Sequence, residues 1–321
     1  MLSKKSKELL DYVVKISNDI AKLKIRGATK IALTALKVLS KVASEAPLNE
    51  FDQIFKKSIE ILINSRPTEP AMQNGIRYIL HIYEKTYSKD GIREEIRHTI
   101  KDATLNFYDI MKKAIDKIVE IGWRRIPNGG VIMTHCHSAT VVRILKRAKE
   151  KDKKFVVITS ETRPLYQGRR TAKELAESGI RVYHIVDSAM RWAAKKFKPD
   201  IAIIGADAIG SNGVVINKIG SKLLALVARE FDFPLYVAST LLKLDVRTVL
   251  GEYTPIELRD PSEVWPDAPP GVEVLNPSFE TIAPDYIDGI ITETGIIAPS
   301  DVLRAFKELY EEIYAVTIPQ H

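Results

Sequence analysis

The chain has 321 residues, of which 45% are hydrophobic, so it can bury a sizeable core and is long enough for two domains. No stretch approaches the roughly 20 apolar residues that a membrane-spanning helix needs, which argues against a membrane partner; we expect a cytoplasmic protein. The net charge of +7 comes from lysines and arginines spread among 41 acidic residues, not from a basic tail, and this argues against nucleic acid as a partner.

The first part of the chain carries apolar residues at helical spacing almost throughout. Four such stripes occupy residues 31–42, 51–62, 72–83 and 92–118. Gly122 is expected to end the last of these helices, because glycine is common just after a helix. Two breaks, at residues 25–29 and 65–68, each place an arginine in or beside a turn next to a following helix.

From residue 122 onward, short apolar runs alternate with amphipathic stretches. The runs cover residues 131–133, 155–158, 182–186, 201–204 and 235–238. The segments predicted to be helices between them include 171–177, 188–197 and 221–231. Continuous apolar runs separated by helices are typical of a parallel sheet that is covered on both faces. The sequence therefore predicts an α/β protein, with a helical domain (1–121) followed by a doubly wound, Rossmann-like parallel-sheet domain (122–321).

Cys136 is the only cysteine, and it follows the first apolar run where a helix is expected to begin. A thiol there faces the positive end of the helix dipole, which predicts a lowered pKa and a thiolate. A lone cysteine is more often a small buried hydrophobic residue. Whether Cys136 is catalytic therefore depends on which residues lie at the other strand ends. His135 and His137 suggest a metal site, but consecutive side chains of an extended chain point to opposite faces, and we expect no metal. A cysteine protease would need a distant base, and His184, within an apolar run, is expected to be packed.

The residues that follow the predicted strands are nearly all polar or ionisable. They are Cys136, Ser160 to Pro164, Asp187, Ser188, Gly205 to Asp207, Ser239 and Thr240, with Lys243 just beyond. In such sheets ligands bind outside the carboxyl ends of the strands, and helix N-termini near Lys and Arg bind anions, which predicts a small phosphorylated ligand. The glycines do not form GxGxxG, and GxxxxGK[ST] is missing, so a dinucleotide cofactor or a P-loop hydrolase is not expected. Taken alone, Arg163 could be a surface cation and Asp207 a turn cap.

Several short motifs in order along the chain resemble one superfamily. They are Arg26-Gly27-Ala28, Arg66-Pro67-Thr68, Glu161-Thr162-Arg163-Pro164 with Gln167-Gly168, Gly205-Ala206-Asp207, Asn212-Gly213, Asn217-Lys218-Ile219-Gly220, Asn276 to Glu280 and Thr292 to Gly295. The superfamily comprises methylthioribose 1-phosphate isomerases, ribose 1,5-bisphosphate isomerases, and the alpha, beta and delta regulatory subunits of initiation factor 2B. The resemblance covers nearly the whole chain, although no single motif is decisive.

Two residues distinguish the isomerases of this superfamily from its regulatory subunits. The isomerases have a cysteine and an aspartate at the positions of Cys136 and Asp207, whereas the regulatory subunits generally lack the pair. Methylthioribose enzymes usually continue the cysteine motif with Asn and a small residue-glycine pair, but this chain has residues 137–140, His-Ser-Ala-Thr. It therefore looks most like the archaeal ribose 1,5-bisphosphate isomerases. A methylthioribose 1-phosphate isomerase and a non-catalytic regulatory subunit are the alternatives.

The resemblance implies conversion of α-D-ribose 1,5-bisphosphate to D-ribulose 1,5-bisphosphate. Asp207, kept protonated by an enclosed site, would protonate the ring oxygen, and Cys136 would remove the C2 proton to give a phosphoenolate; hydride transfer is the competing route. The implied binding residues are Arg26, Gly27, Ala28, Thr29, Arg66, Ser138, Ala139, Thr140, Asn217, Lys218 and Lys243, to which we add Arg163 as a further cation. No metal and no organic cofactor are implied. The partner would be further copies of the chain, as a hexamer built from three dimers.

Overall fold

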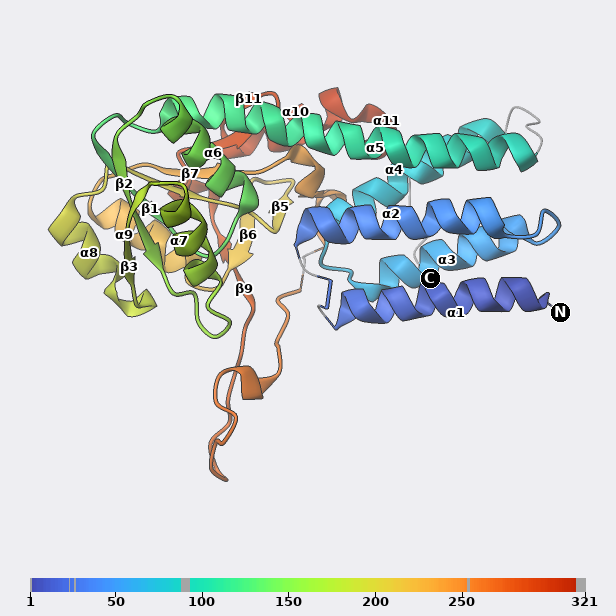
Figure 1. The fold of residues 1–321 in the computed structure, drawn as a ribbon, viewed down its shortest axis with the longest axis horizontal. Helices are drawn as coiled ribbons and strands as arrows, with labels where there is room; N and C mark the ends of the chain where they lie inside the picture. The colour runs from blue at the N-terminus through green and yellow to red at the C-terminus, as the bar shows by residue number, and fades with distance from the viewer. Residues whose placement is uncertain (1, 23, 26, 88–92, 253–254, 316–321) are drawn as a thin grey trace. The chain divides into compact units, whose positions relative to one another are not determined.

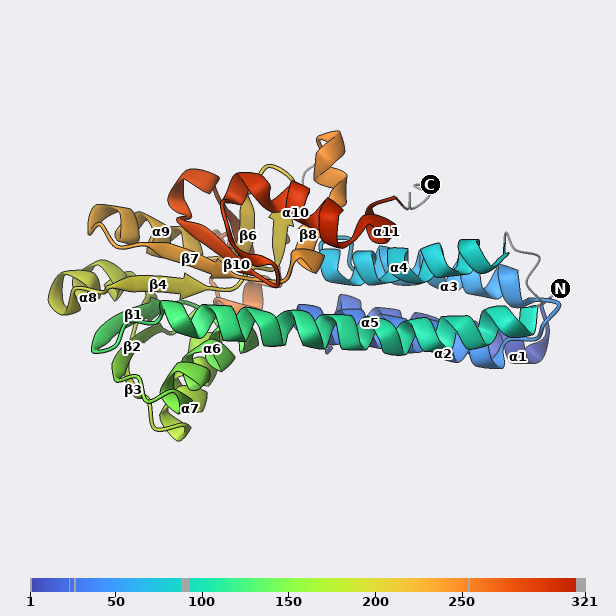
Figure 2. The same ribbon diagram turned by 90° about the horizontal axis from the view of Figure 1, so that it is seen from above.

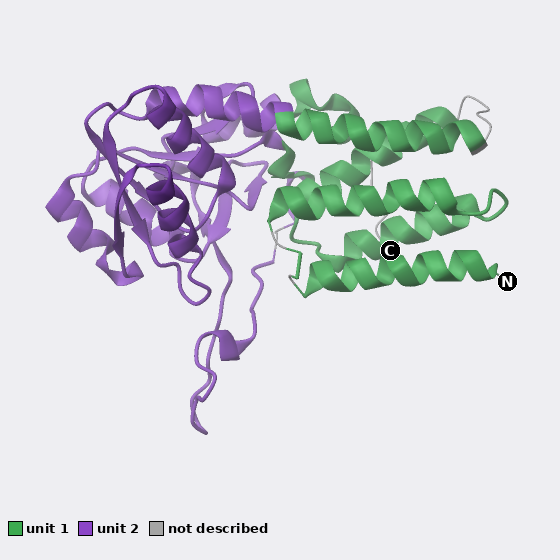
Figure 3. Cartoon of the chain, viewed as in Figure 1, with its two compact units in different colours: residues 1–112, 242–246, 306–321 green, residues 113–241, 247–305 purple. Residues whose placement is uncertain are grey.

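The computed structural model describes residues 2–22, 24–25, 27–87, 93–252 and 255–315. Contacts divide the chain into two compact units (Figure 3). Unit 1 contains residues 1–112, 242–246 and 306–321, and unit 2 contains residues 113–241 and 247–305. The division of the sequence at residue 121 stays a prediction. No helix in the described ranges is long and apolar enough to cross a membrane.

Unit 1 is a bundle of helices whose apolar stripes face one another. Its helices are α1 (Lys4–Ala21), α2 (Ala28–Glu45), α3 (Phe51–Ser65), α4 (Pro70–Tyr87), the first part of α5 (Arg93–Gly122), the end of α10 (Val302–Leu309), and α11 (Glu311–Tyr314). Helix α1 packs against α3, and α2 against α4 (Figure 1). The rings of Phe51 and Phe55 stack with centroids 5.4 Å apart, and Tyr83 of α4 adds a tilted ring 5.3 Å from Phe55. The predicted helical character of this region is confirmed.

A buried amide fixes the later segment that joins this bundle. Asn74 of α4 is fully buried, and its Nδ2 donates to the backbone carbonyls of Leu242 and Leu244, each at 2.8 Å. Leu244 begins the two-residue strand β8 (Leu244–Asp245). A buried side-chain amide needs partners of this kind, because an unpaired one costs roughly 1–3 kcal/mol. These two hydrogen bonds thus attach residues 242–244, which are distant in sequence from α4, to the helices of unit 1.

Unit 2 is built on a seven-stranded sheet in the order β11-β10-β7-β4-β1-β2-β3. The strands are β1 (Gly130–Thr134), β2 (Phe155–Ser160), β3 (Arg181–Ile185), β4 (Ile201–Ile204), β7 (Leu235–Ala238), β10 (Gly289–Thr292) and β11 (Gly295–Ile297). All pairs are parallel except that of β11 with β10. The chain steps outward from β1 to β3 and then returns to place β4 on the other side of β1. This reversal is the point where doubly wound sheets bind ligands.

The helices of unit 2 cover both faces of this sheet. They are α6 (Ala139–Glu150), α7 (Gln167–Glu177), α8 (Met190–Phe197) and α9 (Ser221–Glu230), with the end of α5. Helices α6 and α7 lie on one side of the sheet and α9 on the other (Figure 2). The five predicted strands and the α/β class are confirmed. The predicted helix at 171–177 begins earlier, at Gln167.

A second, smaller sheet was not predicted. Its strands in unit 2 are β5 (Ala208–Gly210), β6 (Val215–Lys218) and β9 (Phe279–Ile282), and β6 pairs antiparallel with both others. Residues 215–218 form a strand in which Val215 and Asn217 are buried while Ile216 and Lys218 are half-buried. Four residues of alternating burial are too few to stand out in the sequence. Residues 255–278, which we call the arm, extend away from both sheets before β9 (Figure 1).

Candidate active site

The loop after β1 holds Cys136 in an unusual backbone conformation. Cys136 has φ = 64°, in the left-handed region that side chains rarely occupy. Its N–H donates to Oγ1 of Thr162 at 3.0 Å, and its carbonyl accepts from Oγ1 of Thr171 at 2.8 Å. The residue as a whole is half-buried. The thiol is therefore presented at the carboxyl end of β1 by hydrogen bonds on both sides of its residue.

The two flanking histidines are engaged by protein atoms. Nε2 of buried His135 lies 2.8 Å from the carbonyl of Ile219, which can only accept, so Nε2 carries the proton and Nδ1 accepts from the Ser160 hydroxyl at 2.6 Å. Burial lowers the pKa of His135, which favours this neutral form. Nδ1 of His137 donates to Thr171 Oγ1 at 3.0 Å, because that hydroxyl already gives its own proton to the Cys136 carbonyl. Both ring nitrogens of His135 serve the fold and leave no lone pair for a metal.

His184, in contrast, is not the packed histidine that its apolar surroundings predicted. It is exposed on the edge strand β3, and its Nδ1 lies 2.8 Å from Oγ1 of Thr159. The prediction failed because β3 is the last strand of the sheet, a position that an apolar run alone does not reveal.

Asp207 follows β4, the strand next to β1. A Cβ atom on Gly205 would lie 2.8 Å from Oγ of Ser138, so the backbone leading to Asp207 passes directly against the cysteine loop. The N–H of Asp207 donates to the carbonyl of Ile216 at 2.9 Å, which fixes the turn on the second sheet. The structure thus brings Cys136 and Asp207 to the two sides of the switch point, and the charge of Asp207 acts on the thiol.

The thiol of Cys136 does not have the lowered pKa that the sequence predicted. Burial, followed by the negative charge of Asp207, raises the pKa of Cys136 from its ordinary value of 9.0 to about 12. The Lys218 ammonium and the backbone N–H of His137 lower the pKa, but by less. Desolvation of the thiolate outweighs the helix end, since a charge that loses water and lies near another anion is disfavoured. The thiol form therefore prevails at neutral pH.

The N-terminus of α9 is already occupied by a carboxylate. Oε1 of Glu280 accepts the N–H groups of Gly220 and Lys222, at 2.6 and 2.9 Å, at the start of α9. Buried Asn217 donates to Ser221 Oγ at 2.9 Å and so fixes the same turn. Helix α9 is therefore not the anion site that helix N-termini near Lys and Arg suggested.

The N-terminus of α6 is the better candidate for an anion. Ser138 caps the helix, and its Oγ accepts the N–H of Val141 at 3.4 Å while its carbonyl accepts that of Val142 at 2.9 Å. The N–H groups of Ala139 and Thr140 belong to the first turn, where a helix offers no internal acceptor. The charge of Lys218, in β6, also acts on Cys136, so a cation lies near the thiol. This arrangement suits a phosphate.

Arg163 and Gln167 lie in the loop after β2. The exposed Arg163 guanidinium donates from Nη1 to the Tyr166 hydroxyl at 2.8 Å and from Nη2 to the carbonyl of Val264, in the arm, at 2.9 Å. Its predicted role in substrate binding stays a prediction, and these bonds give it a structural one. Gln167 belongs to a motif but was not among the predicted binding residues. Its Oε1 is buried and has no hydrogen-bond partner among the described residues. Such an oxygen is a candidate ligand contact.

The other predicted binding residues belong to unit 1, except that Arg26 lies outside the described residues. Gly27 precedes α2 with φ = 91°, which favours glycine, and Ala28 and Thr29 open that helix. Arg66 ends α3 with its side chain largely buried, and its Nε lies 3.7 Å from Oε2 of Glu69. Lys243 closes a short 3₁₀ turn and is half-buried.

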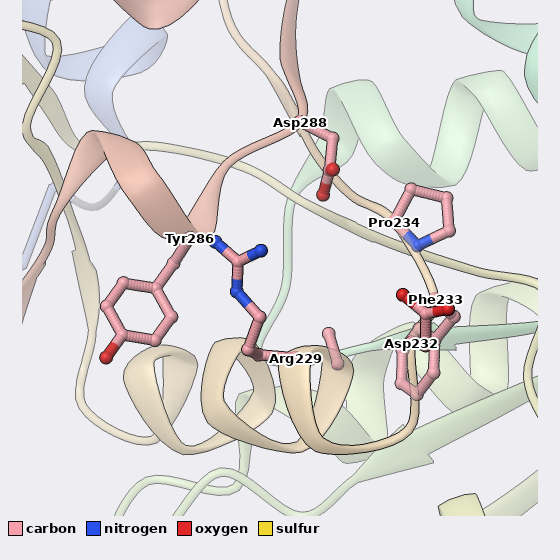
Figure 4. A pocket seen from close by; sticks show the side chains of 7 residues that line it. Arg229, Asp232, Phe233, Pro234, Tyr286 and Asp288 are labelled. Carbon is pink, nitrogen blue, oxygen red and sulfur yellow. The ribbon is translucent and has the colours of Figure 1, made fainter.

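A cavity visible in Figure 4 does not coincide with this site. It is lined by residues of the α9 end and of the segments before β7 and β10, including Arg229, Asp232 and Tyr286. Its Asp288 accepts the N–H of Leu235, the first residue of β7, so the cavity lies at the amino end of that strand and not at the carboxyl end. At about 130 Å³ it is also smaller than the roughly 300–1,000 Å³ of typical ligand pockets. We assign it no role in the chemistry.

Comparison with known proteins places the whole arrangement in one family. The chain is 41% identical over 309 residues to a ribose 1,5-bisphosphate isomerase of Thermococcus kodakarensis, covering 93% of this chain and 94% of that protein. It is 34% identical to a methylthioribose-1-phosphate isomerase of Heliobacterium modesticaldum, covering 94% and 92%. A crystal structure of the Pyrococcus horikoshii OT3 translation initiation factor eIF-2B matches with a TM-score of 0.76 and 30% identity, covering 90% and 97%. Residues 24–299 match the family model, and the chain therefore belongs to the initiation factor 2 subunit family.

Proposed function

We propose that this protein is an aldose–ketose isomerase that converts α-D-ribose 1,5-bisphosphate to D-ribulose 1,5-bisphosphate. The observation that carries the proposal is that Cys136 and Asp207 lie in the loops after β1 and β4, on the two sides of the switch point, with the charge of Asp207 acting on the thiol. The similarity to archaeal ribose 1,5-bisphosphate isomerases supports the choice of substrate. The His-Ser-Ala-Thr sequence at residues 137–140 favours it over methylthioribose 1-phosphate.

In the proposed mechanism the pair works with a single shared proton. The raised pKa of Cys136 keeps its proton on the thiol in the resting site. Transfer of that proton to Asp207 gives a thiolate and a carboxylic acid. Asp207 then protonates the ring oxygen and opens the ring, and Cys136 takes the C2 proton to form a phosphoenolate. Return of that proton to C1, with transfer of the C2 hydroxyl proton to the Asp207 carboxylate, gives the ketose and restores the acid.

The two phosphates require several cations and N–H donors. We propose that the start of α6, with Ser138, Ala139 and Thr140, binds one phosphate together with Lys218. Asn217 fixes the turn that carries Lys218, and the buried Oε1 of Gln167 accepts a substrate hydroxyl. The remaining proposed binding residues are Arg26, Gly27, Ala28, Thr29, Arg66, Arg163 and Lys243.

The test is to incubate the purified protein separately with ribose 1,5-bisphosphate and with methylthioribose 1-phosphate and to assay for ketose. We expect turnover of the bisphosphate only. Cys136→Ser and Asp207→Asn should abolish turnover, whereas Arg66→Ala should mainly raise KM. Near-normal activity of Cys136→Ser would refute the mechanism. Turnover of neither sugar, with tight binding to initiation factor 2, would favour a regulatory subunit.

Isotope labelling separates the proposed enolate from hydride transfer. In deuterated water the enolate route incorporates solvent deuterium at C1 of the ribulose product, because the thiol proton exchanges. Full retention of a deuterium label transferred from C2 to C1 would instead establish a hydride shift.

We also propose that the protein is a cytoplasmic homo-oligomer, a hexamer built from three dimers. The arm, residues 255–278, supports self-association because its apolar side chains are open to solvent, with Leu258 65% and Leu275 67% exposed. The arm has a net charge of −4 in a chain of +7, so it is complementary to the remaining basic surface of another copy. Glu263 braces it, accepting from Arg259 Nε at 2.8 Å and Asn276 Nδ2 at 3.1 Å. Sedimentation of a Leu258→Asp/Leu275→Asp variant tests this: an unchanged mass would exclude the arm as an interface.

A further inference from the structure

The backbone of Cys136 must be held in place by its surroundings. A left-handed φ costs an L-residue about 1–2 kcal/mol, and such conformations persist only where neighbouring groups enforce them. Here the enforcing groups are Thr162, which accepts from the cysteine N–H, and Thr171, which donates to its carbonyl. Their side chains are 0% and 1% exposed, so water does not compete for these bonds. The direction of the thiol thus depends on where these two hydroxyls lie.

Thr162 itself occupies a conformation that is rarer still. It has φ = 62°, and a β-branched residue is a genuine outlier in that region. Its N–H donates to Oδ1 of Asp187 at 2.8 Å, and the N–H of Arg163 donates to Oδ2 of the same carboxylate at 2.8 Å. Because each oxygen accepts from a different amide, only a carboxylate satisfies both; an asparagine would aim its NH₂ group at one of them.

The three residues follow three adjacent strands. Cys136 comes after β1, Thr162 after β2 and Asp187 after β3, and the parallel register aligns these strand ends. Asp187 therefore reaches the thiol through Thr162 and not by direct hydrogen bonding. Its Oδ1 also lies 3.9 Å from Nδ1 of His135, the residue before the cysteine.

We propose that Asp187 is a positioning residue for the isomerisation, which fixes the Cys136 thiol by holding the backbone of Thr162. It serves the proposed activity without contacting the substrate. Its removal should therefore impair the chemical step more than substrate binding. The kinetic test of this proposal rests on the proposed isomerase function, whereas the alkylation test does not.

The kinetic test compares Asp187→Asn, Thr162→Val and Thr162→Ser with the matched control Asp200→Asn. Asp200 accepts the N–H of Val131 at 2.8 Å, an equivalent bond at the opposite end of β1. We expect Asp187→Asn and Thr162→Val to lower kcat about 10- to 100-fold with little change in KM, because small misplacements of a reacting group have effects of this size. Thr162→Ser, which keeps the hydroxyl, and Asp200→Asn should stay near wild type. The double variant Asp187→Asn/Thr162→Val should have a kcat no lower than that of the slower single variant, since both substitutions act on the same contact.

The second test needs no substrate. Cys136 is the only cysteine, so iodoacetamide incorporation, followed by intact mass, reports on this thiol alone. Thr162→Val removes no charge, yet by releasing the loop it should make alkylation severalfold faster, whereas Thr162→Ser and Asp200→Asn should not. If wild type turns over no ribose 1,5-bisphosphate, the proposed function fails while alkylation still decides the positioning. If Asp187→Asn does not fold, the isosteric variant Thr162→Val tests whether this hydrogen-bond chain positions the thiol. A kcat and an alkylation rate of Thr162→Val equal to those of wild type would overturn the proposal.

Discussion

The raised pKa of Cys136 predicts that the native thiol reacts slowly with alkylating reagents. Its pKa of about 12 is three units above the ordinary 9.0, which corresponds to about 1,000-fold less thiolate at pH 8. Since the thiolate is the reactive species, the rate with iodoacetamide should be lower by the same factor. The rate should rise about tenfold per pH unit and show no plateau up to pH 10.

The assay follows intact mass over a series of pH values, with guanidinium-unfolded protein as the reference. Steric protection alone would lower the plateau but leave the midpoint near pH 9, so the pH dependence separates the two causes. Asp207→Asn should shift the profile to lower pH because Asp207 is the second-largest cause of the raised pKa, and Lys218→Met should shift it upward. A plateau below pH 10 in the native wild-type protein would refute the reasoning.

Three further predictions concern stability and are checked by denaturant unfolding. The raised pKa of Cys136 contributes stability that is fully present below pH 9.0 and is lost as the pH rises toward 12. Between these pH values the free energy of unfolding of wild type should therefore fall by up to about 1.4 kcal/mol more per pH unit than that of Cys136→Ser. Parallel curves of stability against pH for the two proteins would contradict this. Gly168→Ala would place Cβ 1.6 Å from the Ser160 carbonyl oxygen and should cost more than about 3 kcal/mol, whereas Gly179→Ala, with φ = 72° and open space, should cost about 1 kcal/mol; equal losses would be inconsistent with the close approach. Glu280→Ala should lower the free energy of unfolding by about 1–2 kcal/mol, because it leaves two N–H groups at the start of α9 without their acceptor. Glu280→Gln should cost less, and a larger loss for Gln than for Ala would exclude Glu280 as the helix cap.

The positions of Cys136 and Asp207 could be predicted because they depend on strand boundaries. Apolar runs mark buried parallel strands clearly, and the residue after each run lies at the carboxyl edge of the sheet whatever the packing details. The neighbours of the thiol could not be predicted in the same way. Thr162 follows β2, the neighbour of β1, and Asp187 follows β3, the neighbour of β2. Local patterns do not encode this order of strands. The occupation of the α9 N-terminus by Glu280 depends similarly on the pairing of β6 with β9.

The sequence by itself determined the helical first part, the α/β second part, and which residue types stand at the strand ends, because these follow from local periodicity and from chemistry that side chains carry everywhere. Only the tertiary structure decided the state of the thiol. A helix end lowers a cysteine pKa and is visible in sequence, but desolvation and the charge of Asp207 come from segments brought together by folding, and here they are stronger. Electrostatic effects depend on distance and burial, and neither is set by sequence separation.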